Sequence, residues 1–286
     1  MCRLFGFRSV IKSQVHKSLI DAENALQTQG HANPDGWGVA YYLGGCPHIV
    51  KSKETAVDNH IFRKVSGIVS SQTVVAHIRL ATKGKNCLLN THPFQFGSWV
   101  FAHNGNIKNF TQFSEEIRSL INPKLAKFIL GTTDSEVIFY FLLSQLDENL
   151  QKKGEDLFSY RSSIFELQTW IKQAIEKLIS IIGSYSQDNN ASNDETFLTF
   201  LLTNGPTLLA FQGGKSFYYS TYKTRCTDRL TCSHFSPECE APTKSGKVNH
   251  FIISSEKLGD ENTWLSLKPG EMVGVDEKML LSSLQL

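Results

Sequence analysis

The sequence lacks long hydrophobic runs and carries almost no net charge, and each absence excludes a class of protein. No stretch of its 286 residues approaches the roughly 20 consecutive apolar residues of a membrane-spanning helix. The formal net charge of +2 provides no long-range field that would attract nucleic acid or an anionic membrane surface. We therefore expect no nucleic-acid partner and no membrane association.

The N-terminus also lacks the apolar core of a secretory signal, because Arg3, Arg8 and Lys12 interrupt it. In a chain without an export signal, the six cysteines are expected to be reduced thiols in the cytoplasm.

Three of these cysteines, Cys226, Cys232 and Cys239, lie near one another in the sequence together with His234. Their spacing matches none of the short cysteine pairs that are typical of structural zinc sites, so we predict no metal and no cofactor. A zinc-binding module is the alternative, and elemental analysis of the purified protein would test it.

Apolar periodicity divides the chain into strands, then helices, then strands again. The expected strands cover residues 2–7, 37–43, 48–51, 73–80, 98–103, 197–203, 207–211, 217–221, 249–254 and 271–275. The expected helices cover 15–27, 115–120, 134–146 and 164–182. This order predicts one layered α+β domain over 2–286, with a mobile loop at 184–195 and a loop insertion at 222–247.

Cys2 directly follows the initiator methionine, and this position gives it an unusual chemistry. If Met1 is removed, Cys2 carries a free α-amine beside its own thiol, so that one residue holds both a nucleophile and a base. The simpler interpretation makes Cys2 a small residue at the start of a strand. Other residues must decide between the two.

Two strand ends carry polar groups that suit such a nucleophile. Asn104-Gly105 follows the strand 98–103, where an Asn side chain and a glycine N–H can hold the oxyanion of a tetrahedral intermediate. The same dipeptide is also the commonest hairpin turn. Arg79 shares a strand face with His77, and its guanidinium can bind a carboxylate in a bidentate manner. A structural arginine bonded to loop carbonyls is the alternative.

Asp134 begins the expected helix 134–146, where the Thr133-x-x-Glu136 pattern predicts a capping box. It lies on the same helix face as the apolar residues Val137 and Ile138. An inward carboxylate can pair with a substrate ammonium, whereas the alternative role is to stabilise the helix dipole.

Together these residues resemble the class II glutamine amidotransferases, which are amide hydrolases with an N-terminal nucleophile. The resemblance rests on Met1-Cys2 with Leu4-Phe5-Gly6, on Pro34-Asp35-Gly36-Trp37-Gly38, and on residues 77–82, 101–105 and 133–136. These motifs occur in the family's order over about the first half of the chain. Residues 254–258, Trp264 and Pro269-Gly270-Glu271 resemble the closing strands of stand-alone members.

The resemblance implies the Ntn-hydrolase fold, a four-layer αββα sandwich of two mainly antiparallel sheets. It implies that Cys2 attacks a side-chain amide while its α-amine moves the proton, directly or through a water. Asn104 and Gly105 would then form the oxyanion hole.

The resemblance also implies which residues bind the amino-acid head of the substrate. Arg79, helped by Thr82, would hold the α-carboxylate of the glutamyl group, and Asp134 would hold its α-ammonium. Synthase-fused relatives usually have histidine where Lys83 stands, so we expect a different lid over the substrate.

The implied function is a glutamine amidotransferase or γ-glutamyl amide hydrolase that releases glutamate from glutamine or another γ-glutamyl small molecule. Because the sequence ends at Leu286, we expect a stand-alone member without a synthase domain. One alternative is a hydrolase of glutathione-like γ-glutamyl peptides within a complex, and an acceptor enzyme or another subunit would then be its partner. A non-catalytic γ-glutamyl-binding module is the other alternative, and the presence of every matching polar residue argues against it.

Overall fold

Two antiparallel sheets form the centre of the computed structural model, which describes residues 2–15, 17–22, 24–81, 85–160, 163–226, 229–243 and 246–286. Each sheet has seven strands, and the strand pairs within the described residues are antiparallel. Sheet A has the order β12 (Leu265–Ser266), β9 (Tyr218–Ser220), β11 (His250–Ser254), β1 (Arg3–Gln14), β4 (Ser70–Ile78), β2 (Trp37–Leu43) and β3 (Cys46–Ser52). Sheet B has the order β10 (Gly246–Lys247), β14 (Leu280–Gln285), β13 (Glu271–Val275), β8 (Leu208–Phe211), β7 (Phe197–Thr203), β6 (Trp99–Asn106) and β5 (Phe94–Phe96).

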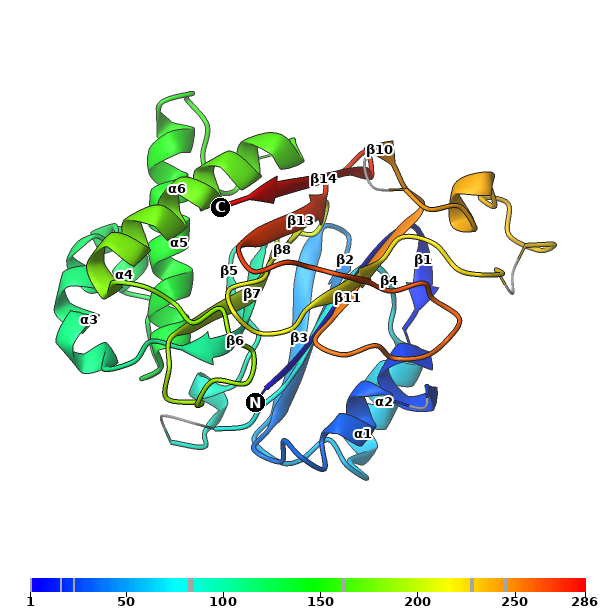
Figure 1. Cartoon of the computed structure of the whole chain (residues 1–286), viewed down its shortest axis with the longest axis horizontal. Coiled ribbons are helices and arrows are strands. Elements are labelled where there is room, and N and C mark those ends of the chain that lie inside the picture. The colour runs from blue at the N-terminus through cyan, green and yellow to red at the C-terminus, as the bar shows by residue number, and fades with distance from the viewer. Residues whose placement is uncertain are drawn as a thin grey trace.

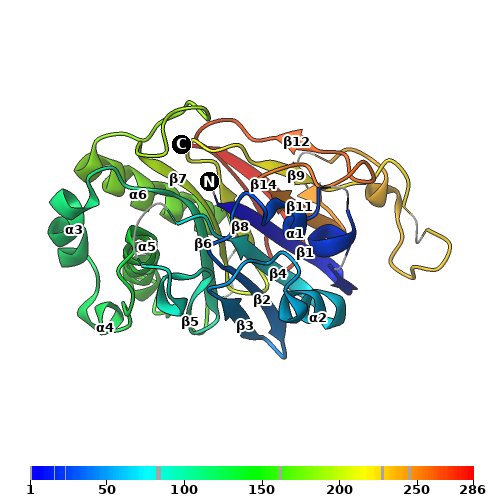
Figure 2. The same cartoon turned by 90° about the horizontal axis from the view of Figure 1, so that it is seen from below.

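Helices cover the outer face of each sheet, so that four layers are stacked (Figure 1, Figure 2). Sheet B carries α3 (Phe110–Ser119), α4 (Pro123–Ala126), α5 (Asp134–Gln151) and α6 (Ile164–Ile182). Sheet A carries a π-helical turn (Lys17–Asp21), α1 (Leu26–Gln29) and α2 (His60–Ile68). Short 3-10 turns occur at Leu88–Asn90 and Pro237–Cys239. The predicted αββα sandwich of antiparallel sheets is confirmed.

Three apolar cores separate the layers, and the alternation of side chains along each strand decides which core a residue joins. On β1, Leu4 packs between the two sheets, whereas Phe5 and Phe7 pack under the helices of sheet A. On β6, Ala102 packs between the sheets and Phe101 packs against α5 and α6. The same alternation directs Cys2 and Asn104 into the space between the sheets.

The predicted faces of β4 are also confirmed. Val75 lies in the core between the sheets, and Val74, Ala76 and Ile78 lie in the outer core. His77 therefore projects between the sheets, and the strand ends directly before Arg79.

The helix expected over 15–27 is wrong. The chain forms the π-helical turn and then α1, and Ala25 between them is extended with ψ of 155°. The break places the Asn24 side chain where its amide donates to Glu256 Oε2 and to Lys257 O, both at 3.0 Å. These tertiary contacts override the local helical pattern.

Of the two hydrogen bonds of the capping box predicted at the start of α5, one is present. Thr133 Oγ1 accepts from Glu136 N at 3.3 Å, as predicted. The Glu136 carboxylate accepts instead from Leu130 N and Gly131 N, at 3.1 and 2.6 Å. It therefore orders the approach to the helix rather than its first turn.

Two long connections complete the chain. Residues 184–195 form turns without helix or strand, and their mobility stays a prediction. Between β9 and β11, the described residues of 222–247 form turns with the 3-10 turn and β10. None of the helices in the described part of the chain combines the length and apolarity needed to cross a bilayer.

Candidate active site

The thiol of Cys2 lies at the start of β1 and contacts the backbone just after β4. Leu80 N donates to Cys2 Sγ at 3.3 Å, and the thiol donates to Leu80 O at 3.3 Å. Burial raises the pKa of the Cys2 thiol, while the Leu80 contact and the Arg79 cation act in the opposite direction. Such a thiol stays protonated near neutral pH, so its use as a nucleophile requires a base.

The loop that touches the thiol is fixed by Asp35 and Gly36. Asp35 N donates to Arg79 O at 3.0 Å, and Arg79 N donates to Gly36 O at 2.8 Å. Ala81 N donates to the Asp35 carboxylate at 2.8 Å. Gly36 has φ of +120°, and a Cβ there would lie 2.7 Å from Ser52 O, so this turn requires glycine. The sequence singled out this motif but gave Asp35 no role.

Asn104 and Gly105 are not a hairpin turn, because both belong to β6 and pair with Thr199 and Leu198 of β7. The Asn104 side chain is buried, and its Oδ1 has no hydrogen-bond partner within the described residues. A Cβ on Gly105 would lie 2.0 Å from Phe197 O, so β7 can approach only a glycine. The amide of Asn104 thus remains available to a ligand.

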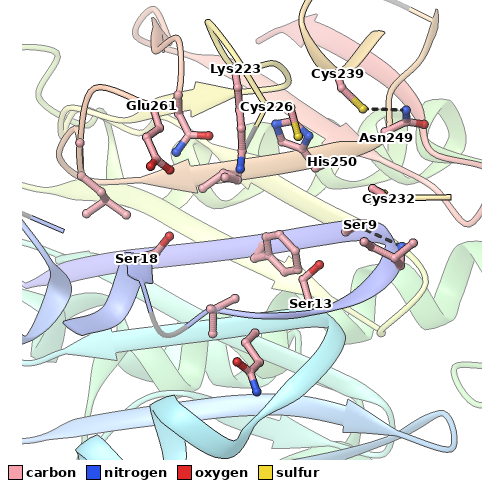
Figure 3. A pocket seen from close by; sticks show the side chains of 18 of the residues that line it. Ser9, Ser13, Ser18, Lys223, Cys226, Cys232, Cys239, Asn249, His250 and Glu261 are labelled. Atoms are coloured by element: carbon pink, nitrogen blue, oxygen red, sulfur yellow. Dashed lines mark hydrogen bonds between the residues drawn. The ribbon is translucent and has the colours of Figure 1, made fainter. Parts of the chain in front are cut away.

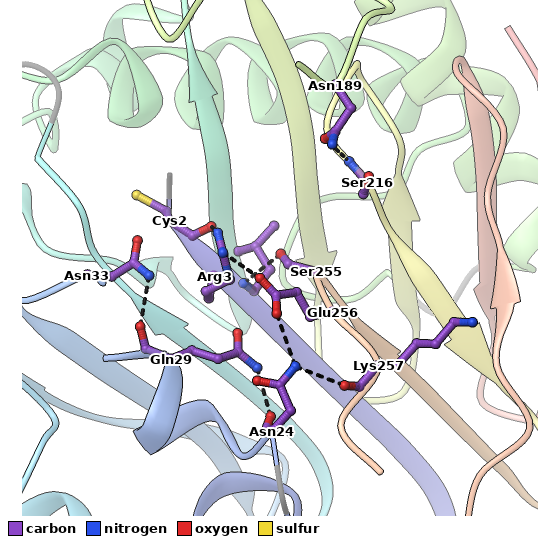
Figure 4. Close-up of polar contacts among 11 residues, drawn as sticks. Cys2, Arg3, Asn24, Gln29, Asn33, Asn189, Ser216, Ser255, Glu256 and Lys257 are labelled. Carbon is purple, nitrogen blue, oxygen red and sulfur yellow. Dashed lines mark hydrogen bonds and ion pairs between the residues drawn. The ribbon is translucent and has the colours of Figure 1, made fainter. Parts of the chain in front are cut away.

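A polar cavity of about 720 Å³ includes Asn104 and the residue after the nucleophile, Arg3. Its other lining residues are Asn24, Asn189, Lys215, Ser216, Tyr218, Ser255, Glu256 and Lys257. It lies where β1 of sheet A and β6 of sheet B come into contact. Figure 4 shows Cys2 and Arg3 at the start of β1, with Asn24, Ser255 and Glu256 around them.

Asp134 is buried at the first turn of α5 and already accepts two backbone hydrogen bonds. Ile107 N donates to Oδ2 at 2.7 Å, and Ser135 N donates to Oδ1 at 2.8 Å. Ser135 Oγ also donates to Oδ1, at 3.4 Å. The helix-terminal role is therefore present, and Oδ2, with one of these contacts, keeps a lone pair for another donor.

Arg79 is 3% exposed, and its charge reaches both Cys2 and His77. The burial of Arg79 fits the predicted contact with a carboxylate. Thr82 and Lys83, the other positions predicted near it, lie outside the described residues.

Three histidines that the sequence did not assign are buried beside this site. The ring centroids of His77 and His92 lie 4.3 Å apart, with the rings tilted by 35° to each other. His103 forms hydrogen bonds with Ser135 Oγ at 2.9 Å and with Phe197 O at 3.0 Å. Burial lowers the pKa of all three, that of His77 to about 3. All three histidines are neutral near pH 7. The sequence alone did not identify them as part of the site, because their burial depends on tertiary contacts.

The cluster of Cys226, Cys232 and Cys239 lies at the end of β1 opposite Cys2 (Figure 3). Cys226, Cys232, Cys239 and His234 all line one cavity of about 500 Å³. Within the part of the chain that the structure describes, no group of three or more metal-ligating side chains could hold an ion. The four residues therefore share a cavity without forming a metal centre there.

These features agree with the comparison to known proteins. The family model of class-II glutamine amidotransferases matches residues 1–177. This chain belongs to the class II glutamine amidotransferase family. The family consists of enzymes, and its Ntn-type fold is the one observed.

Individual relatives extend the match over the whole length. YafJ of Escherichia coli K12, named as a glutamine amidotransferase, is 30% identical over 278 residues, which are 95% of this chain and 96% of that protein. A Saccharomyces cerevisiae protein assigned by name to the same enzymes is 29% identical over 76% of this chain. The match spans only 59% of the yeast protein. A solved class-II domain protein from Silicibacter pomeroyi has a TM-score of 0.61 at 19% identity, covers 100% and 99% of the two chains, and shows the shared fold.

Proposed function

We propose that this chain hydrolyses γ-glutamyl amides, glutamine among them, with Cys2 as the nucleophile. The observation that carries the proposal is the placement of the half-buried Cys2 thiol at the start of β1. The next residue, Arg3, lines a polar cavity together with Asn104, whose side-chain Oδ1 has no hydrogen-bond partner within the described residues. Family membership supports the reaction class.

In the proposed reaction, the α-amine of a mature Cys2 takes the thiol proton, directly or through a water. The thiolate then attacks the γ-carbonyl carbon. The Asn104 amide and the Gly105 N–H stabilise the oxyanion that forms. The C–N bond breaks as the nitrogen receives the proton, and water hydrolyses the thioester to release glutamate and free the thiol.

Arg79 and Asp134 are the proposed partners of the glutamyl α-carboxylate and α-ammonium, with Thr82 assisting Arg79. Opposite charges at the two ends of the zwitterion would fix the reacting carbonyl against the thiol. The burial of both side chains supports this assignment, because a charged ligand contact is stronger away from water.

The proposal treats residues 2–286 as one catalytic domain. β1, which follows the nucleophile, pairs with β4 on one side and with β11 on the other. The C-terminal strands therefore complete the sheet that positions Cys2. A cytoplasmic location, where thiols remain reduced, belongs to the same proposal, as does transfer of the released ammonia to an acceptor enzyme or complex subunit.

Removal of Met1 is the decisive test. With Met1 attached, the nitrogen of Cys2 is an amide without a basic lone pair, so that form would be nearly inactive. Mass spectrometry of the purified chain, paired with a glutamate-release assay on glutamine, should show activity only in the form that begins at Cys2. A homogeneous preparation that keeps Met1 and turns over at full rate would refute the proposed base.

A further inference from the structure

The cavity beside Asn104 carries more positive charge than release of ammonia requires. Among its lining residues are the cations Arg3, Lys215 and Lys257, against one carboxylate, Glu256. Arg3 and Glu256 form an ion pair, which leaves the charges of the two lysines. Ammonia is small and carries no anionic group, so it uses neither this charge nor a cavity of about 720 Å³.

Lys215 is the unusual member of this set, because it is only 4% exposed. Its Nζ donates to Asn189 O at 2.8 Å and lies 3.6 Å from the centre of the Phe197 ring. An ammonium has three donors, and this is the one hydrogen bond that the group makes within the described residues. Burial lowers its pKa, and Asp188 acts in the opposite direction. A buried lysine normally has an anionic partner.

The backbone around Lys215 is held beside Asn104. Lys215 N donates to Thr199 Oγ1 at 3.0 Å, and Thr199 is the β7 residue directly opposite Asn104. Ser216 N donates to Asn189 Oδ1 at 2.9 Å, a contact that Figure 4 draws. Both residues belong to the cavity lining. The lysine therefore has a fixed position relative to the proposed oxyanion donor.

The opposite wall is fixed to the nucleophile strand. Leu4 N donates to Ser255 Oγ at 3.0 Å, and Asn24 holds Glu256 and the carbonyl of Lys257. Lys257 is exposed, and its Nζ lies 5.6 Å from the centre of the Tyr218 ring. Each wall thus contributes one lysine to the lining of the cavity, to which Arg3 of β1 also belongs.

We propose that this cavity receives the leaving group of the substrate, and that Lys215 binds a carboxylate on it, with Lys257 as a second cation at the exposed side. The preferred substrates would then be γ-glutamyl amino acids or short γ-glutamyl peptides rather than glutamine. This inference rests on the proposed function, because it names the group on the far side of the bond that Cys2 breaks.

Paired substrates test the inference in the wild-type enzyme. γ-Glutamylglycine, γ-glutamyl-β-alanine and γ-glutamyl-γ-aminobutyrate would each be compared with the γ-glutamyl alkylamide of matching length that lacks the carboxylate. We expect at least one carboxylate-bearing member to exceed its neutral partner in kcat/KM by on the order of 10- to 100-fold, the range of a charge-assisted contact. The substrate spacer that gives the largest ratio of the two kcat/KM values would indicate how far the carboxylate must extend from the cleaved bond to contact Lys215.

Two variants then locate the effect. Lys215→Met should remove most of that ratio, whereas Lys215→Arg should retain part of it. Lys108→Met is the matched control, since Lys108 is an exposed lysine paired with Glu195 outside the cavity, and it should keep the wild-type ratio. Thermal melting would confirm that each variant is folded.

The outcomes are distinct. Equal kcat/KM for every pair in the wild-type enzyme, or a carboxylate preference that survives in Lys215→Met, would overturn the inference, and Lys215 would then only join the loops at Asn189 and Ser216. Glutamate release from the alkylamides but not from their carboxylate-bearing partners would overturn this inference and leave the proposed function intact. No glutamate from any substrate would instead overturn the proposed function and this inference with it.

Discussion

β1 has a cavity at each end, and the two cavities differ in almost every respect. The cavity at the Cys2 end is lined by polar side chains, with a buried lysine and an unpartnered asparagine amide. The cavity at the far end has an apolar floor that includes Phe7, Val15 and Ile252, beneath three thiols. The proposed nucleophile lies at the end with a single cysteine, whereas the end with three cysteines has no part in the proposed reaction. The proposal therefore rests on the groups around Cys2 and on its place in the chain, and not on the number of thiols.

The largest expected effect separates the two ends directly. Cys2→Ala should abolish glutamate release, because no other thiol can carry both nucleophile and α-amine. The triple variant Cys226→Ser, Cys232→Ser and Cys239→Ser should keep turnover near the wild-type rate. A glutamate-release assay on both proteins, with circular dichroism to confirm folding, makes the comparison. Residual wild-type activity in Cys2→Ala would move the nucleophile elsewhere.

The next effect concerns the amide that faces the polar cavity. Asn104→Ala should lower kcat by on the order of 10²–10³ if its side chain donates to the oxyanion. Asn106→Ala is the matched control, because its amide donates to Glu195 O at 3.1 Å and serves the loop. That control should lose stability rather than kcat. An unchanged kcat in Asn104→Ala would leave Asn104 as a strand residue only.

A smaller effect is expected at the two charges proposed to bind the zwitterionic head. Arg79→Ala and Asp134→Asn should each raise KM by about 10- to 150-fold, the equivalent of one charge-assisted contact, or abolish measurable turnover. Asp134→Asn keeps an oxygen that can accept one of the two backbone hydrogen bonds, so we expect a modest change in melting temperature. Steady-state kinetics with glutamine, alongside thermal melts, would test both. Normal kinetics in either variant would show that the residue does not bind the head group.

The smallest effect is one of stability and comes from the buried histidines near the Cys2 end. Burial, with Arg79 next in size, lowers the pKa of His77 to about 3, against about 6.5 when unfolded. Between these values the unfolded chain binds the extra proton, so the free energy of unfolding falls as the pH drops. From pH 7 to pH 5 one such histidine accounts for about 2 kcal/mol.

Urea unfolding at pH 7, 6 and 5 measures this dependence. His77→Asn should make it shallower by one proton, and His60→Asn, at an exposed position, should leave the slope as in the wild type. A His77→Asn slope equal to that of the wild type would show that His77 is not held neutral.

Local sequence patterns located much of the frame of this site. α6 matches the expected 164–182, because its apolar residues repeat at helical spacing and Ser163 caps its start. β7 and β13 also match their predicted ranges, because each is a short and mostly apolar segment of the sequence. The alternation along β4 correctly put Val75 on the face opposite Val74, Ala76 and Ile78, but it did not indicate which face lies between the sheets. Periodicity is a local property, so it can be read before the fold is known.

The predictions that were wrong concern features that depend on contacts outside the local apolar pattern. The chain bends at Ala25 to bring Asn24 to Glu256, far along the sequence. Glu136 turns to Leu130 and Gly131 because the loop before α5 offers two N–H groups. Lys215 resembles any surface lysine in the sequence, and only the packing of two loops buries it. Residue types near a strand end indicate candidates, but the contacts that select among them come from the other sheet.

The position of β1 in sheet A has a consequence for how the protein is made. The ribosome synthesises β1 (Arg3–Gln14) long before its neighbour β11 (His250–Ser254). Until then one edge of the strand that begins beside Cys2 has no partner, and an open edge invites pairing with other chains. We expect nascent and prematurely terminated chains to depend on chaperones and to cleave no amides. Any activity that depends on the position of Cys2 would thus have to wait until β11 has been synthesised and paired.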